Sequence, residues 1–167
     1  YDKRHEIMAA TGVKPGMVVA DVGAGTGLFT RLFSVKVGQT GKVIAVDISK
    51  PFIENILRTS KAQGLDNVIG LVNTQTDTRL SPNSVDLVFI SDTYHHFEFP
   101  IPTVQSIRRA LRPGGILVVI DFKRAEGVSS PWVMEHVRGG KAEVIKEMGA
   151  RGFKLIEDKD FLRVIFF

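Results

Sequence analysis

A glycine-rich turn is the part of the sequence best suited to hold a ligand. Residues 23–27, which read GAGTG, stand between the apolar run 17–22 and the helix-like run 28–37. Glycines at a strand-to-helix turn tolerate positive φ and let the backbone approach a ligand closely. Asp47 ends the next apolar run, where a carboxylate can accept hydrogen bonds from ribose hydroxyls. Together these features indicate a ligand that contains adenosine.

The spacing of the glycines separates this turn from two other nucleotide-binding motifs. The dinucleotide fingerprint is G-x-G-x-x-G/A, whereas here Leu28 stands at the third glycine position. The phosphate-binding P-loop requires G-K-[ST], which the turn lacks. Asp21, just before the turn, would repel a pyrophosphate and attract a positively charged amino group. The pattern therefore favours an adenosyl ligand with an amino group over a dinucleotide.

The residues after the fourth apolar run could carry the reaction. Residues 91–97, which read SDTYHHF, fall at the carboxyl edge of the predicted sheet, where open α/β sheets bind their ligands. Histidine is the side chain best suited to general-base chemistry near neutral pH, so His95 and His96 are the first candidates. Tyr94 and Asp92 are alternatives. We expect the substrate of the reaction to bind at this segment.

We expect no metal ion from the sequence. Potential ligands are Asp92, His95 and His96, with Asp121 and His136 further along the chain, but they follow no recognised ligand spacing. The chain has no cysteine, which excludes disulfides, a thiolate nucleophile and thiolate metal ligands.

The elements that must position these residues alternate between strand and helix. Two strand candidates near the end, 153–158 and 163–167, are separated by four residues, which favours an antiparallel hairpin over a crossover of a dozen residues or more. The earlier strand candidates are mostly continuous apolar runs, as expected for strands buried on both faces; they are 17–22, 42–47, 67–72, 84–90 and 115–122.

Helix signals lie between these runs. Ser49 can cap a helix that stops near Gly64, and a second helix must end before Pro113. A third is predicted over 141–151, and the segment through Ala10 is an N-terminal candidate. Such alternation predicts an α/β fold with a largely parallel sheet covered by helices on both faces.

Composition and charge bound the functional class. The chain has 167 residues, 44% of them hydrophobic and 24% charged, which predicts one globular domain over 1–167. No apolar run approaches the roughly 20 residues of a membrane span, and the absence of a signal-like start favours a cytoplasmic protein. The net charge of +4 is small, and its densest cluster, Arg108, Arg109 and Arg112, falls at a predicted helix end, where cations suit the macrodipole. Nucleic acid is therefore a partner that the sequence does not favour.

Four segments in order resemble motifs of the class I S-adenosylmethionine-dependent methyltransferases. They are VVADVGAGTGLFT (18–30), VIAVDIS (43–49), VDLVFISDTYHHF (85–97) and LRPGGILVVIDF (111–122). Among subgroups, the chain is most similar to the ubiquinone/menaquinone-biosynthesis-like methyltransferase domain. The resemblance implies a three-layer α/β sandwich, with a doubly wound, mostly parallel seven-stranded sheet whose last strand is antiparallel.

The resemblance also implies a cofactor, S-adenosyl-L-methionine, which leaves as S-adenosyl-L-homocysteine. Asp21 would reach its amino group, Asp47 its ribose and Ile48 its adenine. The family usually meets the adenine amino group with an Asp after the third strand. Asp77 is three positions before Leu80, whereas the usual spacing in the family is four, so Thr76 or Thr78 could take part of this role. The cofactor-binding candidates are Asp21, Gly23, Ala24, Gly25, Thr26, Gly27, Asp47, Ile48, Thr76, Asp77, Thr78 and Ser91.

The expected acceptor is a small molecule, bound to a monomer or a homodimer. The segment after the fourth strand is not the N/D-P-P-Y/F motif of enzymes that methylate nucleic-acid amino groups. The sulfonium of S-adenosyl-L-methionine already activates the methyl group, so orientation alone can accelerate its transfer to a good nucleophile. If the acceptor must lose a proton, the base is His95, His96 or Tyr94. Region 123–140 is either a substrate lid or a plain surface loop. RNA or protein methylation and a non-catalytic cofactor-binding module are the alternatives.

Overall fold

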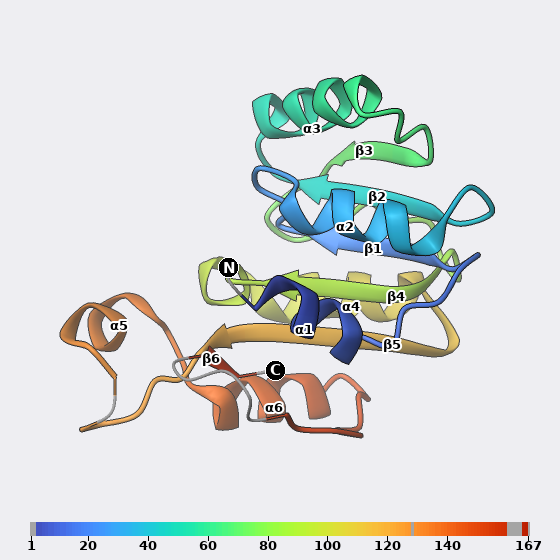
Figure 1. The fold of residues 1–167 in the computed structure, drawn as a ribbon. Coiled ribbons are helices and arrows are strands. Elements are labelled where there is room, and N and C mark those ends of the chain that lie inside the picture. Colours follow the sequence, from blue (N-terminus) through green and yellow to red (C-terminus); the bar gives the residue numbers. More distant parts are fainter. Residues whose placement is uncertain (1–2, 128, 160–164, 167) are drawn as a thin grey trace.

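The computed structural model describes residues 3–127, 129–159 and 165–166 and shows an α/β fold (Figure 1). Five parallel strands lie in the spatial order β3-β2-β1-β4-β5. The order reverses between β1 and β4, and ligands bind at the carboxyl edge of such a switch point. The strands are β1 (Val18–Val22), β2 (Lys42–Asp47), β3 (Val68–Val72), β4 (Val85–Ser91) and β5 (Leu111–Phe122).

Helices cover both faces of this sheet. Helices α1 (Arg4–Ala10), α2 (Leu28–Val37) and α3 (Lys50–Ala62) pack on one face, in a core that contains Phe29, Phe33 and Ile56. Helices α4 (Pro100–Ala110) and α6 (Lys141–Gly149) pack on the other face, with Ile107 and Val144. The short helices η1 (Tyr94–His96) and α5 (Pro131–His136) follow the carboxyl ends of β4 and β5. Among the described residues, no helix is both long and apolar enough to cross a membrane.

Local sequence explains most of the element boundaries. Ser49 caps α3, since its hydroxyl accepts a hydrogen bond from the amide of Phe52, and Gly64 follows the helix with φ of 70°. The five parallel strands begin and end within one residue of the predicted positions, apart from the start of β5. That strand begins at Leu111, before Pro113, because Leu111 pairs with Val85 across a register shift.

The C-terminal part of the fold differs from the prediction. Segment 153–158 forms no strand, so the predicted hairpin and the seventh strand are not found in the described part of the chain. A segment forms a β-strand only when its backbone pairs with a neighbouring strand, and 153–158 is not paired with β5. Strand β6 (Ile165–Phe166) pairs with β5 in the antiparallel direction over two residue pairs, and the rest of 163–167 lies outside the described residues.

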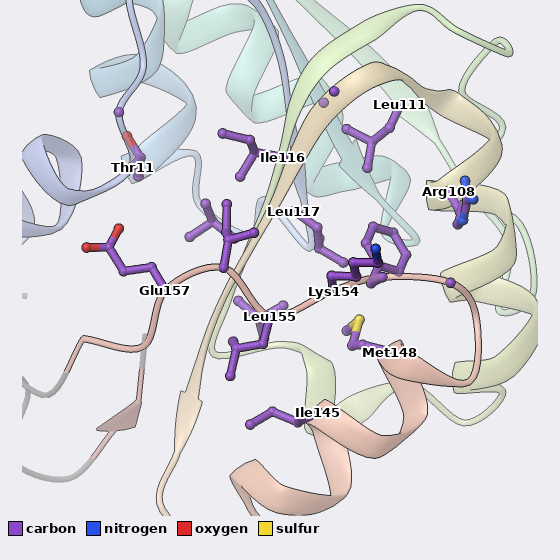
Figure 2. A pocket seen from close by; sticks show the side chains of 18 of the residues that line it. Thr11, Arg108, Leu111, Ile116, Leu117, Ile145, Met148, Lys154, Leu155 and Glu157 are labelled. Atoms are coloured by element: carbon purple, nitrogen blue, oxygen red, sulfur yellow. The ribbon is translucent and has the colours of Figure 1, made fainter.

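A groove lined by both apolar and charged residues separates segment 153–159 from β5 (Figure 2). Its walls include Ile116 and Leu117 of β5, Ile145 and Met148 of α6, and Leu155 of the segment. None of the residues that line it belongs to the glycine turn or to 91–97. The groove therefore lies apart from the residues that the sequence assigns to chemistry.

Candidate functional site

The three glycines of the turn have different physical roles. All three have positive φ: 74° at Gly23, 52° at Gly25 and 78° at Gly27. A Cβ at Gly23 would lie 2.2 Å from Thr93 Cγ2, and one at Gly27 would lie 2.7 Å from Ile56 Cγ1. These two glycines are needed for packing. Among the described residues, a Cβ at Gly25 would meet only the Gly23 carbonyl oxygen, at 4.0 Å, so Gly25 faces the open space that a ligand requires.

Asp47 connects the glycine turn to the start of α3. Its carboxylate accepts hydrogen bonds from the backbone amides of Gly25, at 2.9 Å, and Ser49, at 2.8 Å. The side chain is largely buried at the end of β2. A carboxylate has about four acceptor positions, so both oxygens retain capacity for ribose hydroxyls. Asp47 therefore orders the turn as well as standing where a ribose ligand is expected.

Asp21 lies buried at the end of β1. Its Oδ2 accepts a hydrogen bond of 2.6 Å from the hydroxyl of Thr30 on α2. Burial raises the pKa of Asp21 to about 6, and the neighbouring charge of Asp47 adds to the rise, while the hydrogen bonds from Thr30 oppose it. A buried carboxylate with one side-chain partner would gain a second favourable interaction from a cationic amino group.

Replacing Asp21 with Asn is expected to stabilise the protein at alkaline pH. The pKa of Asp21 is higher in the folded than in the unfolded chain, so its ionisation destabilises the fold as pH rises from about 4 to about 6. Above about pH 6 the loss of folding stability caused by the ionised Asp21 is constant, at up to about 3 kcal/mol for a pKa difference of about two between the folded and unfolded chain. Urea unfolding should therefore show Asp21→Asn to be more stable than the wild type at pH 8 and equally stable near pH 4. An equal difference at both pH values would contradict this assignment.

Two buried polar atoms at the same edge lack hydrogen-bond partners within the described residues. They are the side-chain oxygen of Asn73, which directly follows β3, and the hydroxyl of Ser91, at the end of β4. An unpaired buried polar atom is costly, and a missing ligand is one explanation of it. Ser91 was predicted from the sequence, whereas Asn73 was not. Ile48, beyond Asp47, is 57% exposed and offers an apolar surface at this edge.

The residues predicted to meet adenine lie in less suitable positions. The Asp77 carboxylate accepts hydrogen bonds from Arg109, at 2.9 Å, and from the amide of Arg79. Thr78 is fully buried against Ser106 of α4. Thr76 is exposed on the surface of this loop. Asn73 is a further polar candidate at this edge, because its side-chain oxygen has no hydrogen-bond partner within the described residues.

His95 forms a buried pair with Asp121 of β5. Its Nδ1 lies 2.7 Å from Asp121 Oδ1, and its backbone amide donates to Oδ2 of the same carboxylate. His96 is exposed beside it, with the two ring centroids 4.0 Å apart. Burial and the adjacent His95 and His136 lower the pKa of His96, which favours a neutral ring able to accept a proton.

Tyr94 points into the protein. Its hydroxyl donates a hydrogen bond of 2.6 Å to Glu147 of α6, and the Arg138 guanidinium lies over its ring. Burial and the nearby Glu147 carboxylate raise the pKa of Tyr94. Tyr94 therefore remains protonated and fixes η1 to α6, while His95 is buried against Asp121 and His96 is exposed.

Helix α5 brings aromatic rings to this edge. Ser130 caps the helix, and Val133 and Val137 anchor it in the protein. Trp132 and His136 stand one turn apart with their rings stacked, 4.6 Å between centroids. Figure 1 shows α5 beyond the carboxyl end of β5, on the side of the sheet away from β3.

Comparison with known proteins agrees with this geometry. Residues 20–119 match the sequence profile of a family described as a methyltransferase domain. The chain is 30% identical over 159 residues to the ubiquinone/menaquinone biosynthesis C-methyltransferase UbiE of Hydrogenovibrio crunogenus, which covers 95% of this chain and 59% of that protein. It is 32% identical over 124 residues to UbiE of Pseudoalteromonas translucida, covering 74% of this chain and 49% of that protein. The chain thus spans only part of the length of these curated relatives.

Solved structures share the fold. A SAM-dependent methyltransferase from Aquifex aeolicus superposes with a TM-score of 0.88 at 27% identity, covering 97% of this chain and 85% of that chain. Phosphoethanolamine N-methyltransferase 2 of Haemonchus contortus, in complex with S-adenosyl-L-methionine, shares the fold with a TM-score of 0.82 at 23% identity, covering 96% and 39%. With the glycine turn and the sheet order described above, these matches show that the chain belongs to the class I S-adenosylmethionine-dependent methyltransferase family.

Proposed function

We propose that this chain binds S-adenosyl-L-methionine at the carboxyl edge of its sheet and transfers the methyl group to a small-molecule acceptor. The main support is the space in front of Gly25, which has positive φ and where a Cβ would meet no side chain of the described residues within 4 Å. The Asp47 carboxylate, the candidate ribose ligand, lies at the same edge as the side-chain oxygen of Asn73, which has no hydrogen-bond partner in the described part of the chain. The C-methyltransferase names of the relatives favour a small organic acceptor.

In this proposal the adenosine lies across the ends of β2 and β3. The ribose hydroxyls donate to the remaining acceptor positions of Asp47, and adenine packs on the exposed side chain of Ile48. The amide of Asn73 donates to the carbonyl of Asp47, which places Asn73 next to the ribose site. Its side-chain oxygen is then the acceptor for the adenine amino group, a role that Asp77 does not need to fill.

The methionine part of the cofactor lies between Asp21 and Ser91. The buried Asp21 carboxylate attracts the amino group directly or through water, and the hydroxyl of Ser91 gains the partner it lacks within the described chain. Thr93 bonds to the carbonyls of Gly23 and Ser91, so it ties the acceptor segment to the glycine turn. The sulfonium would then face the segment that holds the histidines.

The acceptor binds between η1 and α5. His96 is the base for an acceptor that must lose a proton, because it is exposed and its lowered pKa favours the neutral ring. Asp121 positions His95, which supports the neighbouring ring. Trp132 is 55% exposed and offers a flat face to an unsaturated or aromatic acceptor.

Calorimetry and a transfer assay test this function together. We expect S-adenosylhomocysteine to bind more tightly than NAD, because Asp21 favours a cationic amino group and Leu28 replaces the third glycine of the dinucleotide turn. Radiolabelled methyl transfer to a panel of phenols, quinols and amines should identify an acceptor class. Tighter binding of NAD would overturn the proposal.

Two variants test the placement of adenine in the same titrations. Asn73→Ala should weaken S-adenosylhomocysteine binding by about two- to tenfold, the range expected for one lost hydrogen bond. Asp77→Ala is the matched control, because Arg109 and the Arg79 amide already occupy its carboxylate, and it should bind normally. Normal binding by Asn73→Ala together with weakened binding by Asp77→Ala would instead assign the contact with the adenine amino group to Asp77.

A further inference from the structure

Three of the four histidines in the chain meet at one place. His95 and His96 lie on η1, and His136 comes from α5, 40 positions later. The ring centroids are 4.0 Å apart for His95 and His96, 5.3 Å for His95 and His136, and 5.1 Å for His96 and His136. One donor atom from each ring lies within 4.8 Å of those from the other two.

The buried member of this histidine cluster is held in the manner of a metal ligand. His95 Nδ1 is bonded to Asp121, which leaves Nε2 as the nitrogen able to bind an ion. Histidines that bind metals almost always direct their other ring nitrogen to a carboxylate or carbonyl, which fixes the ring and increases its basicity. Asp121 provides this support.

Asp121 is better suited to the supporting role than to direct binding. Its two oxygens accept from the His95 ring, the His95 amide and the Phe122 amide, at 2.7 to 2.9 Å. A second arrangement, of Asp92, His95 and Asp121, would have to break these bonds to free the carboxylate. The three imidazoles require no such change.

The two outer histidines are accessible and partly fixed. His96 and His136 are both exposed, so an ion can reach the histidine cluster from solvent. His136 stacks on Trp132, whose ring meets Phe122 edge to face. Ligand atoms in a tetrahedral zinc site lie about 3.4 Å apart, given bonds of about 2.0 to 2.1 Å. Small rotations of the exposed rings from their present separation therefore suffice.

We propose that His95, His96 and His136 bind a divalent transition-metal ion of the zinc type. Imidazole nitrogen suits zinc, copper, iron and nickel, and three protein ligands leave a fourth position for water or an acceptor oxygen. Bound there, the ion would polarise an acceptor hydroxyl and lower its pKa, so in the metal-bound protein the ion takes the place of His96 as the group that activates the acceptor. That use rests on the proposed methyl transfer, whereas binding of the ion does not.

The test is zinc binding by purified apo protein that carries no histidine tag. We expect about one Zn²⁺ per chain by equilibrium dialysis, and Co²⁺ should give the intense visible absorption of a tetrahedral site. His136→Gln and His96→Gln should each weaken Zn²⁺ binding by more than about 100-fold, since loss of even a supporting partner costs about 10- to 100-fold. Asp121→Asn should fall in that lower range.

His5→Gln is the matched control, because His5 is the fourth histidine and lies on α1, and it should bind Zn²⁺ like the wild type. Circular dichroism checks that each variant is folded. S-adenosylhomocysteine affinity, measured without metal, should be unchanged in His136→Gln, so failure of the metal site and failure of the cofactor site give different results. Unchanged Zn²⁺ affinity in the folded His136→Gln and His96→Gln variants, or no binding by the wild type, would overturn the proposal.

Discussion

Gly25→Val is expected to weaken S-adenosylhomocysteine binding by at least about 100-fold, which corresponds to about 2.7 kcal/mol. A Cβ at Gly25 points into open space, so the branched side chain would fill the volume assigned to the cofactor. The backbone there has φ of 52°, which a β-branched residue adopts only at a cost of about 1 to 3 kcal/mol. Both affinity and stability should therefore fall, and the two effects must be measured separately by calorimetry and urea unfolding.

Gly64→Val supplies the control for backbone strain. Gly64 has φ of 70°, and a Cβ there also meets nothing within 4 Å, but the residue follows the C-terminal end of α3. Asp47 and Gly25 lie at the opposite end of that helix. Gly64→Val should lose similar stability and keep wild-type affinity. If Gly25→Val remains folded and binds normally, the glycine turn serves only the fold.

The sheet was predictable where burial alone determines the strands. β1, β2 and β4 are apolar on both faces, so their continuous runs identify them without knowledge of their neighbours. Pairing decided the other cases. Leu111 joins β5 despite the Pro-Gly-Gly that follows it, because β4 offers a partner. Segment 153–158 has strand-like residues but is not paired with β5. The local sequence alone does not show that Leu111 becomes part of a strand while segment 153–158 does not.

The candidate site was predictable as separate segments and not as contacts. Spacing within 21–27 identified the glycine turn because the motif is local. The partners Asp121 and Glu147 stand 26 and 53 positions from His95 and Tyr94, respectively, so only the packing of β5 and α6 brings them together. Asn73 had a detectable signal, since it is the first polar residue after the third apolar run.

Asp47→Ala is expected to reduce both cofactor affinity and apo stability. Loss of two charge-assisted bonds to the ribose should weaken S-adenosylhomocysteine binding by about 1.5 to 4 kcal/mol, or roughly ten- to a thousandfold. The same carboxylate already accepts from the amides of Gly25 and Ser49, so the apo protein should also lose about 1 to 3 kcal/mol. Asp47→Ala alone therefore cannot separate binding of the ribose from ordering of the turn and the start of α3.

Ser49→Ala separates the two roles of Asp47. It removes the hydroxyl that caps α3 and leaves the Asp47 carboxylate in place, so apo stability should fall by about 1 kcal/mol without a change in affinity. Calorimetry on both variants, at a temperature where each is fully folded, compares the cofactor affinity lost with the carboxylate and the affinity lost with the helix cap. Both substitutions also lower the stability of the apo protein. The ribose assignment requires Asp47→Ala to lose much more affinity than Ser49→Ala. Equal affinities would mean that Asp47 acts only by ordering the turn and α3, and that the adenosine lies elsewhere.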